Sequence, residues 1–281
     1  MDSKVGNAAE GEHMRPMDPM RVFDRAAVRM HRDRAAPAVV QVSDLLGDLA
    51  GRLVGRLDDT TRHFSRALDV GGRGAVAPLL RKRGMEVVSC DLSASMAALN
   101  GTPCAAADEE FLPFAPGSFD LVVASLSLHW VNDLPGALIQ LRHALRPQGL
   151  FLASLPVLGT LAELRVALTE AEAILKDGAS PRVSPFPELR DCAHLLQRAG
   201  FTLPVADQEE LVLLYADPLA LLRDLRAAGE TNAATLRDRR PPPAGLFPMA
   251  LSALPRHDGR AQVTLRMAIM TGWAPEAACS Q

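Results

Sequence analysis

The sequence of 281 residues predicts an α/β fold in which helices cover both faces of a mostly parallel sheet. From residue 66 onward, short apolar runs alternate with amphipathic stretches, and the connections are short, as in sheets built from strand–helix–strand units. The run 121–124 is apolar at consecutive positions, which is typical of a central strand buried on both faces. A glycine-rich turn follows the first expected strand and precedes a helix.

The expected elements follow in order from these patterns. Before residue 66, apolar residues recur mainly at helical spacing and predict two or three helices. Apolar and β-branched runs predict seven strands, at residues 66–70, 86–90, 103–106, 119–125, 150–155, 202–215 and 262–271. Amphipathic spacing predicts further helices at residues 76–83, 93–99, 134–145, 160–175, 189–198 and 218–228.

We therefore expect four regions along the chain. Residues 1–18 are small and polar without periodicity, which predicts a disordered leader. Residues 19–65 form a helical N-terminal cap, and residues 66–156 form the ligand-binding core. Residues 157–281 supply helical insertions and the C-terminal part of the sheet.

Composition and charge argue against several functional classes. A formal net charge of -3 gives no overall attraction to nucleic acid or to an anionic membrane surface. No apolar run approaches the length of about 18 residues that a membrane span needs. The N-terminus lacks the order of a signal peptide, so we expect a bacterial cytoplasmic protein, or a matrix protein if the source is mitochondrial. The four cysteines form no C-x-x-C pair, and we predict no metal site.

A local basic stripe stands out within this mildly acidic chain. Arg21, Arg25, Arg29 and Arg32 recur every three or four residues and so share one helix face. We interpret this face as solvated. A lid, or a docking surface for an acidic partner, is the alternative.

The glycine-rich turn is the first candidate ligand site. Asp69 lies at the end of the first expected strand, and Gly71, Gly72 and Gly74 follow it. Glycines allow a tight turn and a close approach of backbone to ligand, while Asp69 can accept hydrogen bonds. The turn predicts that the carboxyl ends of the strands bind a nucleotide-like molecule.

Carboxylates also follow the next two expected strands. Asp91 lies about 20 residues beyond the turn, where an acidic residue can bind ribose hydroxyls. Asp108, with Glu109 and Glu110, follows the third strand, where a carboxylate can accept a hydrogen bond from the exocyclic amine of adenine. The alternatives are a helix N-cap for Asp91 and a solvated loop for the three later residues.

In their order along the chain, these motifs resemble those of class I S-adenosylmethionine-dependent methyltransferases. The motifs are Asp69-x-Gly71 with its glycines, Asp91, residues 107–114, residues 118–123 and Leu145-Arg146-Pro147-x-Gly149. The resemblance implies a Rossmann-like fold with a mostly parallel seven-stranded sheet, helices on both faces, an N-terminal helical extension and helical cap insertions.

A closer resemblance covers nearly the whole chain, from about residue 21 to residue 273. It is carried by residues 107–114, 126–135, 160–165, 184–186, 194–201, 229–232 and 272–273. These segments resemble the mitochondrial and alphaproteobacterial family of respiratory complex I assembly factors with a methyltransferase fold. The chain is more distantly similar to malonyl-carrier-protein O-methyltransferases.

The resemblance implies S-adenosylmethionine as cofactor and a protein side chain as acceptor, possibly in a quinone-module subunit of complex I. The predicted cofactor-binding residues are Asp69, Gly71, Gly72, Gly74, Asp91, Leu92, Asp108, Glu109, Ser125 and Leu126. The predicted catalytic residues are His129, as a base or hydrogen-bond donor, and Trp130, which can pack on a cationic or planar substrate. The alternative for this pair is a structural helix start that packs on the core.

The resemblance leaves the reaction open between methyl transfer and arginine hydroxylation. The sequence contains no H-x-D with a later histidine at the spacing of an iron triad, so only the resemblance implies hydroxylation. In addition, Gly71 and Gly74 enclose two residues where the family has three. The alternatives are therefore a carrier-protein or small-molecule O-methyltransferase, and a non-catalytic assembly chaperone.

Overall fold

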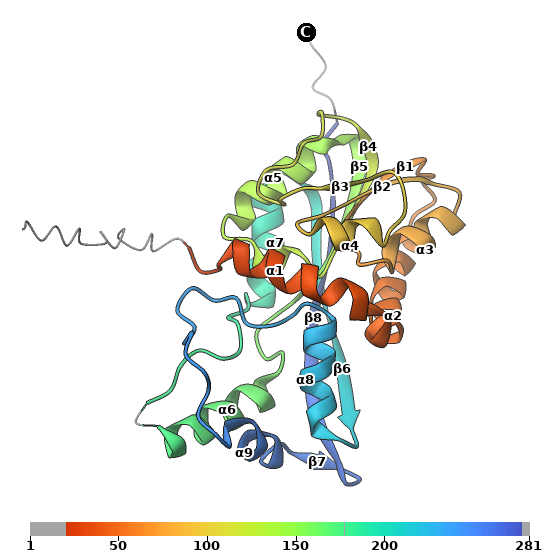
Figure 1. The fold of residues 1–281 in the computed structure, drawn as a ribbon. Coiled ribbons are helices and arrows are strands. Elements are labelled where there is room, and N and C mark those ends of the chain that lie inside the picture. Colours follow the sequence, from red (N-terminus) through yellow and green to blue (C-terminus); the bar gives the residue numbers. More distant parts are fainter. Residues whose placement is uncertain (1–20, 177, 277–281) are drawn as a thin grey trace, which may run out of the picture.

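The structure is a computed structural model that describes residues 21–176 and 178–276 (Figure 1). The expected leader at residues 1–18 lies outside the described residues. The chain first forms α1 (Arg25–Ala35) and α2 (Ser43–Gly55), joined by the 3-10 helix η1 (Ala36–Val42). Asp24 caps α1, because its carboxylate accepts a hydrogen bond from the amide of Ala27 at 3.1 Å. A second 3-10 helix, η2 (Arg56–Asp59), leads to the sheet.

The sheet confirms the predicted α/β fold. Its strands are β1 (Arg66–Val70), β2 (Glu86–Asp91), β3 (Cys104–Ala106), β4 (Phe119–Ser125), β5 (Leu145–Pro156), β6 (Thr202–Tyr215), β7 (Arg256–His257) and β8 (Arg260–Trp273). Seven of them follow the order β3-β2-β1-β4-β5-β8-β6, in which β8 alone runs antiparallel to its neighbours β5 and β6. The sequence missed β7, because two residues that pair with β8 leave no periodic pattern.

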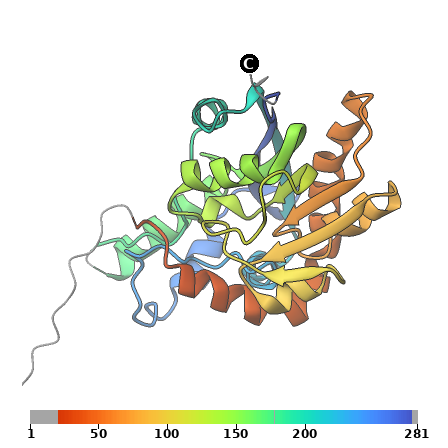
Figure 2. The same ribbon diagram turned by 90° about the horizontal axis from the view of Figure 1, so that it is seen from above.

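Helices cover both faces of the sheet, and β4 shows why its sequence is continuously apolar. Leu121 and Val123 pack toward α2 and α3 (Val76–Lys82), whereas Val122 and Ala124 pack toward α5 (Leu134–Ala144) and α7 (Leu189–Arg198). Figure 2 shows this layered arrangement from above. The short helix α4 (Ala94–Ala98) connects β2 to β3.

A second apolar cluster lies where β6 and β8 extend beyond the core (Figure 1). There α6 (Ala162–Leu175), α8 (Pro218–Ala227) and α9 (Leu246–Ser252) pack against the extended strands. Of the helices described, none is long and apolar enough to cross a membrane.

Candidate functional site

The order of the strands places the candidate site between β1 and β4. Chain connections leave in opposite directions from these two adjacent parallel strands, toward β2 on one side and β5 on the other. Ligands of open α/β sheets bind outside the carboxyl ends of the strands at such a switch point. The predicted residues from Asp69 to Trp130 lie at or just beyond the carboxyl ends of these strands and their neighbours.

The glycine turn folds tightly over Asp69. Gly71 has φ +70 and donates its amide to the carbonyl of Cys90 at 2.8 Å. A Cβ on Gly72 would lie 2.2 Å from Oδ1 of Asp69, so only glycine fits there. Burial raises the pKa of Asp69 to about 7, and the hydroxyl of Ser89 donates to its Oδ2 at 3.3 Å. Oδ1 of Asp69 lies directly against Gly72 and has no hydrogen-bond partner among the described residues.

Arg73 occupies the shortened part of the turn with φ +49. Its buried guanidinium donates to the carbonyl of Leu126 at 2.7 Å and forms an ion pair with Glu230. Its Nε and Nη1 have no partner among the described residues. The guanidinium of Arg73 therefore extends from the short loop across the carboxyl end of β4.

Asp91 ends β2 and is fully buried. Its Oδ1 accepts hydrogen bonds from the amide of Ser93 at 2.8 Å and from Nη1 of Arg32 at 3.2 Å. Its Oδ2 has no partner among the described residues. The N-cap interpretation of Asp91 is wrong, because the hydroxyl of Ser93 caps α4 by accepting the amide of Met96 at 3.1 Å.

Two of the three acidic residues after β3 pair with arginines of α1. Asp108 accepts from Nη2 of Arg25 at 2.6 Å, and Glu109 is buried against both Arg25 and Arg32. Burial alone would raise the pKa of Glu109, but the two arginines hold it below its usual value. Glu110 turns away and accepts the amide of Asp133 at 3.3 Å. The solvated-loop interpretation is therefore wrong for Glu109.

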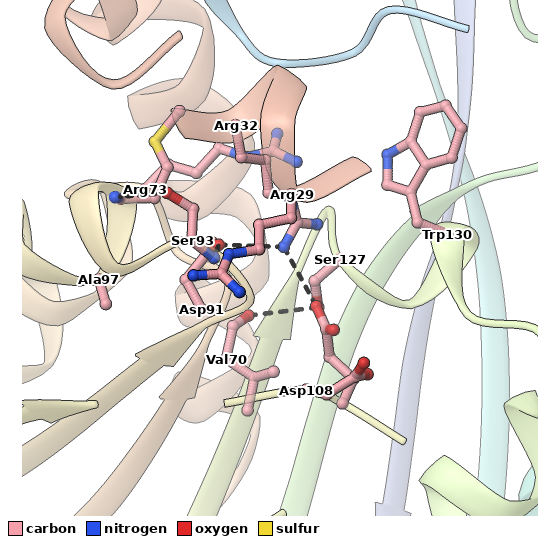
Figure 3. A network of polar contacts seen from close by, with 12 residues as sticks. Arg29, Arg32, Val70, Arg73, Asp91, Ser93, Ala97, Asp108, Ser127 and Trp130 are labelled. Atoms are coloured by element: carbon pink, nitrogen blue, oxygen red, sulfur yellow. Dashed lines mark hydrogen bonds and ion pairs between the residues drawn. The ribbon is translucent and has the colours of Figure 1, made fainter. Parts of the chain in front are cut away.

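These contacts also correct the interpretation of the basic stripe. Arg25 and Arg32 are not solvated; they point from α1 onto the carboxylates at the ends of β2 and β3. Figure 3 shows Arg32 beside Asp91 and Ser93. Arg29, with 61% of its side chain exposed, follows the expectation. Arg21 is exposed as well, but it precedes α1 and so does not share its helix face. The helix α1 covers the candidate cofactor site.

The segment after β4 forms a second polar cluster. His129 and Trp130 lie in the 3-10 helix η3 (Leu128–Trp130) and are both buried. Nε2 of His129 lies 2.8 Å from Oε2 of Glu230, and Nε1 of Trp130 donates to the same oxygen at 3.0 Å. We call Arg73, His129, Trp130 and Glu230 the Glu230 cluster. Sequence analysis missed Glu230 as a site residue, although it lies in the segment 229–232 that carries the resemblance.

The remaining predicted residues lie around this cluster. Ser125 pairs through its hydroxyl with that of Ser154 at 3.4 Å, and Leu126, with φ +53, donates its amide to the carbonyl of Ser154 at 3.0 Å. Leu92 packs on an apolar group that includes Phe23 and Trp130. These contacts anchor the end of β4 and close the site with apolar side chains.

A cavity of about 730 Å³ adjoins the Glu230 cluster and extends toward α6 and α8. All four cluster residues and Leu126 line it, and leucine is the most frequent residue type among the others, which also include charged residues such as Arg182, Arg237 and Asp238. Asp91, Asp108 and Glu109 lie outside its lining. Of the predicted residues, Leu126, His129 and Trp130 line the cavity, whereas the carboxylates of Asp91, Asp108 and Glu109 pair with arginines of α1. Within residues 21–176 and 178–276, no cluster of His, Cys, Asp and Glu could hold a metal ion.

Comparisons with known proteins identify the family. Residues 68–153 match the family model described as a methyltransferase domain. The chain is 36% identical over 271 residues to the mitochondrial arginine-hydroxylase NDUFAF5 of Danio rerio, which covers 91% of this chain and 84% of that protein. The chain belongs to the NDUFAF5 family of methyltransferase-fold proteins.

Related enzymes and structures agree with this NDUFAF5-family assignment. A malonyl-[acyl-carrier protein] O-methyltransferase of Halorhodospira halophila is 36% identical over 237 residues, covering 80% of this chain and 78% of that enzyme. The crystal structure of a methyltransferase-like protein from Bacillus halodurans has a TM-score of 0.54 at 15% identity, over 80% of this chain and 99% of that one. The predictions of a Rossmann-like methyltransferase fold, an enzyme of this class and S-adenosylmethionine as its cofactor are confirmed.

The residues at the switch point fit this cofactor. Oδ2 of Asp91 is a buried acceptor without a partner among the described residues. It could therefore accept a hydrogen bond from a ribose hydroxyl. The turn at Gly71 and Gly72 leaves no space for side chains, because a Cβ would lie 2.5 Å from that of Ser127 at Gly71 and 2.2 Å from Oδ1 of Asp69 at Gly72. The role of each individual residue remains a prediction.

Proposed function

We propose that this chain uses S-adenosylmethionine to modify an arginine side chain of a respiratory complex I subunit during assembly of the complex. The observation that carries this proposal is the 36% identity with NDUFAF5, an arginine-hydroxylase by name, over 84% of that protein's length. The resemblance of the sequence motifs to complex I assembly factors supports the choice of a quinone-module subunit. The corresponding location is the bacterial cytoplasm, or the matrix if the source is mitochondrial.

In this proposal the ends of the strands hold the cofactor. Oδ2 of Asp91 accepts a hydrogen bond from a ribose hydroxyl, while Oδ1 stays paired with Arg32. Asp108 and Glu109 lie along the edge of the adenine. Leu92, Ser125 and Leu126 line the remaining walls. Bound S-adenosylmethionine supplies an electrophilic methyl group. The main task of the protein is then to position the acceptor and exclude water.

A carboxyl O-methyltransferase is the second candidate, because malonyl-carrier-protein methyltransferases reach the same 36% identity. Carrier proteins are acidic, so the basic stripe on α1 is the natural docking surface to test. Alanine replacement of all four arginines is unsuitable, since Arg25 and Arg32 hold buried carboxylates. Exchange of exposed Arg29 alone tests docking without disturbing the cofactor site.

Calorimetric titration with S-adenosylmethionine tests the cofactor site. We expect the wild type to bind and Asp91→Asn to lose affinity by about 10-fold or more, because a charged hydrogen bond contributes about 1.5–3 kcal/mol. Asp120→Asn is the matched control: Asp120 binds the amides of Ser65 and Arg66, at 2.8 and 2.9 Å, at the opposite end of the strands. No binding by the wild type would favour a non-catalytic chaperone and refute the proposal.

Mass spectrometry of complex I subunits tests the acceptor. Subunits from cells that lack this chain are incubated with the purified protein and S-adenosylmethionine, in air and with an added reductant so that hydroxylation is also possible. The proposal requires an arginine-containing peptide to gain the mass of a methylene group or of an oxygen atom. Modification of a carrier-protein acyl group instead would identify the second candidate.

A further inference from the structure

Glu230 is fully engaged within the Glu230 cluster. Its Oε1 pairs with Arg73, and its Oε2 accepts from both Trp130 and His129. Burial alone would raise the pKa of Glu230, but Arg73, His129 and Arg32 hold it well below its usual value. Glu230 is therefore a buried anion, and both of its oxygens accept hydrogen bonds.

This arrangement determines the protonation of His129. A carboxylate oxygen only accepts hydrogen bonds, so Nε2 of His129 must carry a proton to approach Oε2 at 2.8 Å. Burial lowers the pKa of His129, and Arg73 and Arg32 add to this effect while Glu230 opposes it. The ring is thus neutral at pH 7, and its lone pair lies on Nδ1.

Nδ1 has no partner among the described residues, although it is buried. A buried polar atom without a hydrogen bond costs about 1–3 kcal/mol, so such atoms call for a functional explanation. His129 lines the cavity next to Leu126, at the end of β4. The rings of Trp130 and Phe186 lie beside it, with centroids 5.1 and 6.3 Å from that of His129.

We infer that Glu230 is a positioning residue that holds the lone pair of His129 on Nδ1, and that Nδ1 accepts the proton of an N–H acceptor during methyl transfer. This inference rests on the proposed function and narrows it to methylation of a side-chain nitrogen atom that bears a hydrogen. As the acceptor atom bonds to the methyl carbon, its proton passes to Nδ1. The carbon–sulfur bond breaks and its electron pair stays on sulfur, leaving a neutral thioether. Glu230 then stabilises the imidazolium, and no further reactant is needed.

Nuclear magnetic resonance of the full chain, labelled with ¹⁵N-histidine and saturated with S-adenosylmethionine, tests the tautomer without an acceptor. The spectrum of His129→Gln assigns the signals. At pH 7 we expect a protonated Nε2, which couples to both ring C–H groups, and an unprotonated Nδ1. In Glu230→Gln we expect the Nδ1 titration to move to lower pH, because a nearby negative charge is lost. The opposite tautomer, a doubly protonated ring, or a titration unaffected in Glu230→Gln overturns the inference.

Turnover of the acceptor found by mass spectrometry tests the role of Nδ1. We expect His129→Gln to lower kcat by about 100-fold or more, the usual contribution of a general base, while S-adenosylmethionine affinity stays near that of the wild type. The wild-type kcat falls at acid pH as Nδ1 becomes protonated. His257→Gln is the control, because His257 is 63% exposed and distant in the fold, on β7.

The outcomes separate the two proposals. Absent cofactor binding or absent mass gain contradicts the proposed function itself. If the wild type is active and His129→Gln has a similar kcat, only the inference about Nδ1 is contradicted. The same holds if the acceptor gains an oxygen atom.

Discussion

Replacement of Arg32 by methionine tests whether α1 is held in place by the buried carboxylates at the ends of the strands. The guanidinium of Arg32 is fully buried and lies 3.2 Å from Asp91 and 3.1 Å from Glu109. Methionine keeps the apolar stem of the side chain but removes the charge. Loss of one partner of a buried ion pair costs about 3–5 kcal/mol, because the other charge stays buried. Arg25 still neutralises Glu109, so we expect the free energy of unfolding to fall by about 3 kcal/mol.

Urea unfolding at several pH values measures this effect. Arg32 helps to hold the pKa of folded Glu109 below its usual value of 4.5, so this carboxylate stabilises the fold at higher pH and ceases to do so as the pH falls. The difference between wild type and Arg32→Met is therefore largest near pH 7 and shrinks below about pH 4.5.

Arg29→Met is the matched control on the same helix. Arg29 is 61% exposed and lies 3.9 Å from Asp33, so we expect a change within about 0.5 kcal/mol. A loss below about 1 kcal/mol for Arg32→Met, or equal losses for the two variants, would refute the reasoning.

Three further variants test the turn and the cap. Gly72→Ala places a Cβ 2.2 Å from Asp69 and should abolish S-adenosylmethionine binding in calorimetry, whereas Gly51→Ala in α2, with nothing within 4 Å, should leave it unchanged. Asp69 has its pKa raised to about 7, so folding stability should decline from about pH 4 to pH 7, and Asp69→Asn should remove that decline in thermal melts. Glu172 is buried against Arg182. Burial alone would raise the pKa of Glu172, but hydrogen bonds from Arg182 and Ser180 lower it to about 2. Its stabilisation should therefore be lost as the pH falls from about 4.5 toward 2, and Glu172→Gln should lower stability at pH 7 by about 1–3 kcal/mol.

The sheet was predictable because each strand carries its own local signal. The four consecutive apolar residues 121–124 indicated a strand buried on both faces, and the structure packs alternate residues of β4 on the two helical layers. The two-residue strand β7 was missed because its formation depends on pairing with β8 rather than on its own residues.

The cofactor site was predictable in position but not in its contacts. Asp91 and Asp108 were expected at the ends of neighbouring strands, because parallel strands bring their carboxyl ends to one edge of the sheet. The arginines that meet these carboxylates were interpreted as solvated, because helical spacing shows which residues share a face but not what that face contacts.

By itself the sequence determined the α/β fold, the carboxyl ends of the strands as the ligand site, the family and the cofactor. Only the tertiary structure decided that α1 covers the carboxylates and that Glu230 fixes His129. Arg32 and Asp91 lie 59 residues apart, and His129 and Glu230 lie 101 residues apart. Such pairs leave no periodic trace in a single sequence, because they form only when separate elements pack over the same end of the sheet.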